Sequence, residues 1–314
     1  MENIMHKKSK TNSYEVFIPE TEEIRSWFKV SSNRKKVWNI QLWMVEELKK
    51  ICEKHNLKYY ADWGTLLWAI RHWWYIPRDD DVDLAMFRED YDKFLKIAEK
   101  ELPNYIKLCD YHGWFSKLVN INTTALWGDN WWDENFSGGI RIDIFPIDYA
   151  SKYMVINRIK NIILLFLRMI LDSQKSYRFV DKMKSWKKFI LKISKYVFRK
   201  INCKKLRQIY EKINKKVFFK WKQIYTASII YRYYPESIYY KSHNVKFENI
   251  DICIPNWYDE YLTIAYGNYM KPIIDSWHNC WYSVEESYKD IIKWFDKNKS
   301  DTDNYNSCKS LFLL

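Results

Sequence analysis

The chain has 314 residues, of which 47% are hydrophobic, and a formal net charge of +13, so it is long enough to bury a sizeable core in one large domain or two smaller ones. Its six cysteines never occur at Cys-x-x-Cys spacing, which excludes the sequence signatures of a zinc site and of a disulfide framework and fits a reducing compartment. The longest apolar run, residues 162–167, is far shorter than the roughly 20 residues of a membrane-spanning helix, and the first residues lack the apolar stretch of a secretory signal, so we expect a cytoplasmic protein without a membrane crossing.

The first element with a clear pattern is a helix over residues 37–55, where apolar side chains recur about every 3.6 positions and charged ones lie opposite. A short strand, residues 58–61, leads from it into Gly64 and Thr65, and residues 65–71 are predicted to form a second helix. A glycine lets the backbone approach a ligand closely, and the amino end of a helix offers free N–H groups to phosphate. An ordinary helix cap is the alternative interpretation of this turn.

Four aspartates open the next segment, which continues as an apolar strand; they are Asp79, Asp80, Asp81 and Asp83. In an extended chain Asp81 and Asp83 project to the same face, while Val82 between them faces the core. Carboxylates this close repel one another, and burying an unpaired one is costly unless a cation neutralises it. Oxygen ligands of this kind suit Mg²⁺ or Mn²⁺. A solvated acidic turn is the alternative.

Two further segments follow before the middle of the chain. Residues 89–101 predict an amphipathic helix, and residues 105–124 predict a pair of strands that includes Lys117. Residues 138–150 predict another strand, in which Ile142 and its alternate neighbours face one side and Asp143 faces the other.

Residues 151–222 carry most of the positive charge. They contain 22 Lys or Arg and three acidic residues, a net charge of +19, whereas the rest of the chain sums to −6. They are predicted to form three helices, and the middle one, residues 179–201, is basic on one face and apolar on the other. An anionic membrane surface is the first choice of partner. Nucleic acid is the second choice, because no nucleic-acid motif accompanies the charge, and a helical hairpin packed on the core is the third interpretation.

A glycine-hydroxyl turn, a helix and an acid-apolar-acid strand together resemble the nucleotidyltransferase superfamily. Residues 64–86 are similar to the signature of the LicD family of phosphotransferases, which includes the phosphocholine transferases and is related to fukutin-type proteins. The matching residues are Gly64, Thr65, Leu66, Leu67, Ala69, Arg71, His72, Ile76, Pro77, Asp79, Asp80, Asp81 and Asp83. Residues 142–148 and 254–270 also resemble family segments. The family usually has glycine, glycine and tryptophan at three positions that are occupied here by Trp68, Trp74 and Arg78.

The resemblance implies an α+β fold, with a nucleotidyltransferase-like mixed sheet flanked by helices and a basic helical insertion. Residues 1–150 would form the catalytic core, residues 151–225 the insertion, and residues 226–314 a C-terminal part that completes the core. We expect the protein to be peripheral on the inner face of the cell membrane, held there by residues 151–222.

The resemblance also implies the site. Asp81, Asp83 and Asp143 are expected to be the catalytic acids and to hold Mg²⁺ or Mn²⁺, with Asp143 completing the metal shell or taking the proton of the acceptor hydroxyl. The residues expected to contact the donor and its phosphates are Gly64, Thr65, Arg71, His72 and Lys117. Lys117 would neutralise charge in the transition state, although a surface strand lysine explains it equally well. Gln41 lies where family members often have glutamine, and a buried packing role suits it at least as well as a catalytic one.

The implied activity is transfer of a phospho-alcohol, phosphocholine first, from a CDP-linked donor to a hydroxyl of a cell-surface glycan or teichoic acid precursor, with release of CMP. Trp127, Trp131 and Trp132 crowd one loop and could enclose choline by cation–π contact. Aromatic residues also stack on sugars and fill cores, and glycerol phosphate or ribitol phosphate would suit the same acids. A nucleotidyltransferase acting on a small molecule is the alternative enzyme. The intact acids argue against a glycan-binding protein that only kept the fold.

Overall fold

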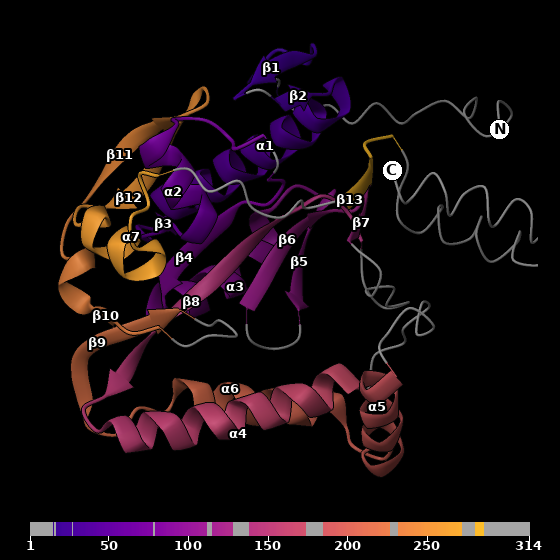
Figure 1. Ribbon diagram of the computed structural model, residues 1–314, viewed down its shortest axis with the longest axis vertical. Helices are drawn as coiled ribbons and strands as arrows, with labels where there is room; N and C mark the ends of the chain where they lie inside the picture. Colours follow the sequence, from indigo (N-terminus) through magenta and orange to yellow (C-terminus); the bar gives the residue numbers. More distant parts are fainter. Residues whose placement is uncertain are drawn as a thin grey trace, which may run out of the picture.

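The computed structural model describes residues 15, 17–26, 28–77, 79–111, 115–127, 138–173, 185–226, 232–271 and 280–285 (Figure 1). In this part of the chain a mixed β-sheet forms the centre, and helices pack around it. The expected α+β class, a mixed sheet flanked by helices, is confirmed.

The long strand β8 (Arg141–Ser151) organises the central sheet. Along one edge it pairs in parallel with β4 (Asp83–Phe87), and β3 (Tyr60–Ala61) pairs antiparallel with β4 beyond it. Along its other edge β8 pairs antiparallel with two strands, one beside its first half and one beside its second half. These are β6 (Phe115–Asn120) with its neighbour β5 (Ile106–Tyr111), and β9 (Lys220–Thr226) with its neighbour β10 (Tyr234–Pro235).

β8 is buried on both faces for most of its length. Ile142, Ile144 and Ile147 are fully buried on a strand whose other face is also covered, and Asp143 is only 7% exposed. A near-continuous apolar run is typical of such a central strand. The strand predicted over residues 138–150 is therefore confirmed, and its single acid lies inside the protein.

Four helices lie close to the sheet. Their bounds are α1 (Ser32–Lys54), α2 (Trp63–Arg71), α3 (Arg88–Glu101) and α7 (Tyr258–Tyr266). The predicted helix over residues 37–55 is confirmed, but it begins earlier because the Ser31 hydroxyl caps it, accepting a hydrogen bond from the backbone N–H of Arg34 at 3.2 Å. In α1 the apolar face is buried against the sheet and the acidic turn that precedes β4.

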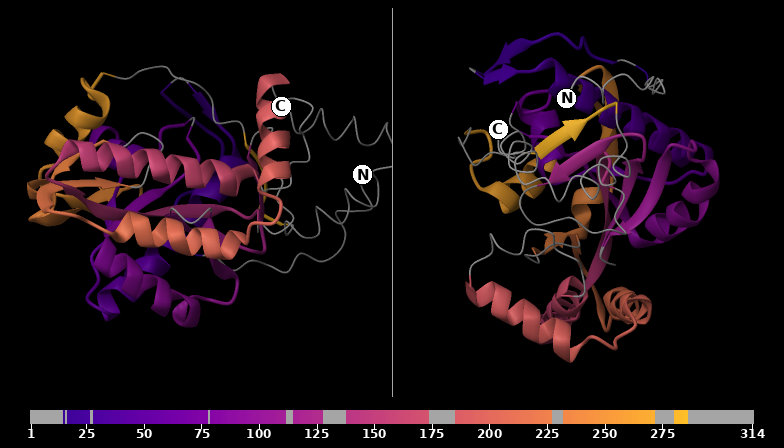
Figure 2. Two further views of the ribbon diagram at one scale, coloured as in Figure 1. Left: turned by 90° about the horizontal axis from the view of Figure 1, so that it is seen from below. Right: turned by 90° about the vertical axis from the view of Figure 1, so that its right-hand side faces the viewer.

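The predicted insertion forms a layer of its own, below the sheet in the view of Figure 1. It consists of α4 (Met154–Ser173), α5 (Ser185–Val197) and α6 (Cys203–Lys215). Seen from below, α4 and α6 lie side by side and α5 crosses their end (Figure 2). The sheet strand β9 begins at Lys220, so the last residues of the segment 151–225 belong to the central sheet.

Short elements complete the described fold. Three two-stranded sheets pair β1 (Glu23–Arg25) with β2 (Phe28–Val30), β11 (Ser242–Phe247) with β12 (Ile250–Pro255), and β7 (Thr124–Trp127) with β13 (Cys280–Ser283). The 3-10 helix η3 (Glu236–Tyr239) precedes β11. None of the described helices combines the length and apolar character that crossing a bilayer requires.

Candidate active site

The register of the central sheet brings three predicted site residues side by side. Asp83 on β4 lies opposite Asp143 on the parallel neighbour β8, and Lys117 on β6 lies opposite Asp143 on the other edge. The backbone N–H of Asp143 donates to the carbonyl of Val82 at 2.8 Å, which fixes the two acid-bearing strands against each other. Residues far apart in the sequence therefore meet at the start of β4 and β8.

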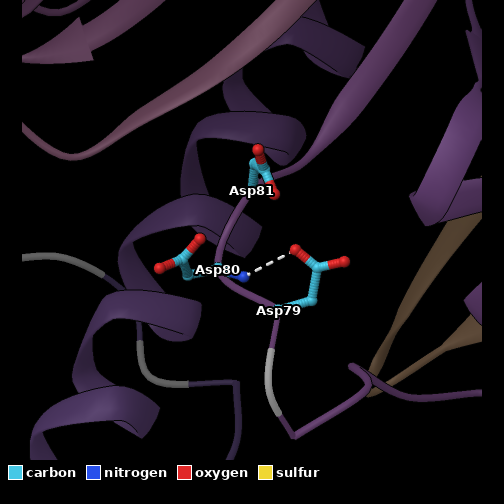
Figure 3. A group of neighbouring side chains, drawn as sticks. All are labelled: Asp79, Asp80 and Asp81. Atoms are coloured by element: carbon cyan, nitrogen blue, oxygen red, sulfur yellow. Dashed lines mark hydrogen bonds between the residues drawn. The ribbon is translucent and has the colours of Figure 1, made fainter. Parts of the chain in front are cut away.

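The turn before β4 adds a compact acidic cluster. Carboxylate oxygens of Asp79, Asp80 and Asp81 all lie within 4.8 Å of one another. Figure 3 shows that the Asp80 carboxylate points to one side of the turn, away from those of Asp79 and Asp81. On that side Arg34 of α1 places its Nη1 atom 3.1 Å from Asp80 Oδ2. Arg34 therefore compensates the Asp80 charge.

Burial and mutual repulsion shift the pKa values of two of these acids. Burial, and then the negative charges of Asp81 and Asp143, raise the pKa of Asp83 well above its ordinary value. Burial and the neighbouring Asp81 likewise raise the pKa of Asp79. Burial in a low-dielectric environment and the neighbouring carboxylates both disfavour the charged form of these two acids.

Lys117 offsets one of these charges. Its Nζ atom lies 3.0 Å from Asp143 Oδ2, and Arg141 Nε lies 3.6 Å from the other carboxylate oxygen, Oδ1. Burial, and next the charge of Arg141, lower the pKa of Lys117 to about 8. A buried ammonium beside a cluster of carboxylates is suited to contact a phosphate that approaches the cluster.

The residues fit a divalent cation with oxygen ligands. The donor set consists of carboxylates alone, its oxygens are close together, and burial and mutual repulsion raise the pKa of Asp79 and of the adjacent Asp83. Mg²⁺ and Mn²⁺ prefer such ligands. Within the described part of the chain the 4.8 Å group contains Asp81 but neither Asp83 nor Asp143. Asp79 was not among the predicted ligands, because it lies in a turn closed by its N–H to the Ile76 carbonyl, where strand alternation carries no information.

Polar side chains from helices hold the acid-bearing segments in place. Gln41 of α1 donates from Nε2 to the carbonyl of Asp80 at 2.6 Å and to that of Arg141 at 3.2 Å. Thr65, predicted to contact phosphate, accepts a hydrogen bond from the backbone N–H of Asp83 at 2.9 Å. Gln41 and Thr65 therefore tie α1, α2, β4 and β8 together at the site, and of the two roles considered for Gln41 these hydrogen bonds fit the buried structural one.

Gly64 is required by its neighbours at the start of α2. A Cβ atom added there would lie 3.0 Å from the ring of Trp68 and 3.6 Å from Asp79 Oδ2. Trp63, just before it, adopts a left-handed φ of 42°, and strained backbone of this kind concentrates at functional sites. The glycine thus lets the indole of Trp68 and the acidic turn approach the helix closely.

Asp62 was not predicted as part of the site, and it lies directly behind Asp83. Its side chain is fully buried, its Oδ1 accepts a hydrogen bond from the Tyr261 hydroxyl, and its backbone N–H donates to the Asp83 carbonyl at 3.0 Å. Its other oxygen, Oδ2, has no hydrogen-bond partner among the described residues. Burial raises the pKa of Asp62 to about 6. The only signal in the sequence is an acid two positions before Gly64.

The remaining residues that were predicted to contact the donor lie away from the acidic cluster or outside the described part of the chain. Arg71 and His72 lie at the far end of α2 from Gly64, about 12 Å away along a helix of this length. Arg71 donates from Nη1 to the carbonyl of Tyr269 at 2.7 Å, and burial followed by the charge of Arg71 lowers the pKa of His72. The expected choline cage of Trp127, Trp131 and Trp132 cannot be placed, because the Trp127 side chain and residues 128–137 lie outside the described part.

Comparison with known proteins points to one family. Residues 56–163 match the LicD/FKTN/FKRP nucleotidyltransferase domain. The chain is 27% identical over 239 residues to the lipopolysaccharide cholinephosphotransferase LicD of Haemophilus influenzae, covering 70% of this chain and 85% of that protein. Shorter matches reach uncharacterized proteins of Rickettsia typhi, 37% identical over 65 residues, and of Rickettsia prowazekii, 40% identical over 47 residues. They cover 21% and 15% of this chain and 20% and 18% of those proteins.

Proposed function

We propose that this chain, a transferase of the LicD family whose nucleotidyltransferase domain matches residues 56–163, moves a phospho-alcohol from a CDP-linked donor to a glycan hydroxyl and releases CMP. The observation that carries the proposal is the meeting of Asp83, Asp143 and Lys117 across three adjacent strands, beside the acidic turn. Such a set can bind metal and phosphate together, and it needs no covalent nucleophile.

Each group in the site has a role in this reaction. Asp79, Asp81 and Asp83 would hold Mg²⁺ or Mn²⁺, which supplies positive charge to the donor diphosphate when bound. Lys117 would add positive charge at the transferring phosphoryl group. Asp143 would take the proton of the acceptor hydroxyl while the oxygen forms its bond to phosphorus and the bond to the CMP oxygen breaks. Asp143 is suited to this because its Oδ1 accepts no hydrogen bond from the described residues.

Phosphocholine is the preferred phospho-alcohol. The Haemophilus influenzae relative is named for transfer of cholinephosphate to lipopolysaccharide, which supports CDP-choline as donor and an envelope glycan, or a lipid-linked precursor of one, as acceptor. Glycerol phosphate and ribitol phosphate are the alternatives, because the acids and Lys117 would act on the donor's phosphates and would not contact its alcohol.

A comparison of donors tests this proposal. The purified full chain is mixed with Mn²⁺ and CDP-choline, CDP-glycerol or CDP-ribitol, and thermal unfolding and CMP release are followed. We expect one donor to raise the unfolding temperature selectively and to yield CMP. Pyrophosphate release from CTP with a small-molecule acceptor would instead identify a nucleotidyltransferase.

Matched variants connect the reaction to the acids. Asp81→Asn removes a carboxylate of the acidic cluster, whereas Asp251→Asn removes a half-exposed one on β12 that pairs with Lys246 at 2.8 Å. CMP release should disappear only in the first variant. Equal turnover in both variants would contradict the role given to the acidic cluster.

A further inference from the structure

The insertion exposes a long apolar stripe on α4. Asn157, Leu164 and Ile170 are buried on its inner side, toward the rest of the protein. The outer side carries apolar residues at helical spacing that are 42–67% exposed, namely Val155, Ile159, Ile162, Phe166 and Met169. α4 contacts α5, α6 and β8, and within the described part of the chain the outer stripe stays exposed, although Phe166 also meets the ring of Phe198 edge-on at 6.2 Å between centroids. Water-soluble proteins rarely leave an apolar surface of this length exposed unless it binds something.

α5 continues the exposed surface at the end of α4. Its outward side chains, which are 47–69% exposed, are Trp186, Phe189, Ile193, Tyr196 and Val197. Tryptophan and tyrosine are enriched where protein meets the boundary between water and lipid. The aromatic character therefore suits the headgroup zone of a bilayer.

A second aromatic group lies at the other end of the insertion. Phe219 packs edge-on against Tyr153 with ring centroids 5.3 Å apart, and both are more than half exposed. Lys152 lies over the ring of Trp221 at 5.2 Å, and Lys216 lies over Phe218 at 4.7 Å. Long basic side chains that cover exposed aromatic rings can keep their charge in the headgroup layer while the rings enter lipid.

Positive charge borders these apolar side chains. Exposed basic residues of the insertion include Arg158, Lys192, Lys195, Arg199, Lys200 and Lys212. Of the insertion's few acids, Glu211 forms an ion pair with Arg88 of α3, with 3.1 Å between its Oε2 atom and Arg88 Nη1. The segment 151–222 thus keeps a large positive excess at its surface, which complements an anionic one.

We propose that α4 and α5 form a docking surface for an anionic lipid bilayer. Helices with an apolar stripe and basic flanks lie in the interface plane, where the stripe enters the acyl boundary and the cations contact anionic headgroups. Nucleic acid would satisfy the charge but not the apolar stripe, and a second copy of this chain would bring like charges together.

Vesicle flotation of the full chain tests this proposal. The protein is mixed with vesicles of phosphatidylcholine alone, or of phosphatidylcholine with one third phosphatidylglycerol. We expect the protein to float with the anionic vesicles and not with the neutral ones. High salt should abolish flotation with the anionic vesicles. The double variant Ile162→Ser with Phe166→Ser should weaken binding about tenfold or more, whereas Ile24→Ser, at an exposed apolar residue on β1, should leave it unchanged.

Three results would overturn the proposal. They are no flotation of the wild type on anionic vesicles, equal flotation of the wild type and the double variant, and a dimer in sedimentation that the double variant abolishes while vesicles do not bind. Circular dichroism and thermal unfolding of each variant show whether the fold is kept. Lys192→Glu with Lys195→Glu offers a second route, because reversed charge should weaken anionic-vesicle binding without removing apolar surface.

Discussion

The buried carboxyl of Asp62 should make the stability of the protein depend on pH in a specific way. Its pKa is raised to about 6 from an ordinary 3.8, a difference of about two units, and each unit corresponds to about 1.4 kcal/mol. The folded state therefore keeps the Asp62 proton between pH 3.8 and about 6, where the unfolded state has already lost it. The stability contribution of this group is lost as pH rises through that window.

Asn at this position would remove the ionisation and keep an oxygen to accept the Tyr261 hydroxyl hydrogen bond. Asp62→Asn should therefore be more stable than the wild type by about 3 kcal/mol above pH 7. Near pH 4, where Asp62 is protonated in the folded state, the advantage should be small. The gain arises because the folded wild type must bury a charged carboxylate whose Oδ2 has no hydrogen-bond partner among the described residues.

Urea unfolding followed by circular dichroism, in chelator and at several pH values from about 4 to 8, measures this difference. The matched control is Asp251→Asn, whose carboxyl has a pKa lowered by its hydrogen bond to Lys246, so that variant should show no gain at high pH. A pH-independent difference between wild type and Asp62→Asn would refute the reasoning, because it would mean that Asp62 titrates alike in the folded and unfolded states.

Three other predictions concern the site. Asp81→Asn and Asp83→Asn should each reduce transfer at least about 100-fold and abolish stabilisation by Mn²⁺ in thermal unfolding, with the circular dichroism spectrum unchanged. Transfer by the wild type should fall as pH rises through about 8, because Lys117 loses its proton there; Lys117→Arg stays charged, so a kcat/KM profile that keeps the same alkaline limb in this variant would argue against the assignment. Gly64→Ala should cost about 1–3 kcal/mol in urea unfolding through its contact with the Trp68 ring, and the same substitution should cost less when it is made in the Trp68→Leu background.

Sequence periodicity predicted the elements that carry the site. The strand with Asp143 follows from alternating isoleucines, and α1 follows from apolar residues at helical spacing. Asp148, further along the same strand, pairs with the first residue of α3, since Arg88 donates from Nε to its Oδ1 at 2.8 Å. Local patterns sufficed in these cases because the spacing of apolar residues within each segment shows which of its faces is buried.

The parts that the sequence did not predict depend on contacts between distant segments. Tyr261 reaches Asp62 across 199 positions, and Gln41 reaches the Arg141 carbonyl across 100. Neither partner carries a periodic or spacing signal that identifies the other. Asp79 belongs to the same class, because its raised pKa comes from burial and from the neighbouring acids, which only the folded turn brings together.

The two tryptophans that replace family glycines act in different places. Trp68 is 2% exposed and packs against Tyr75, which in turn stacks on Trp38 with ring centroids 4.8 Å apart. Trp38 donates to the Asp79 carbonyl at 3.3 Å, so this aromatic stack supports the acidic turn from inside the core. Trp74 is 38% exposed and lies near His72, at the end of α2 distant from Gly64. An effect of these replacements on the site should therefore come through Trp68 and the acidic turn that it supports. Trp68→Gly should lower the urea midpoint of unfolding by leaving a cavity in this stack, whereas Trp74→Gly, at a partly exposed side chain, should change it little, and equal losses in both variants would contradict this assignment.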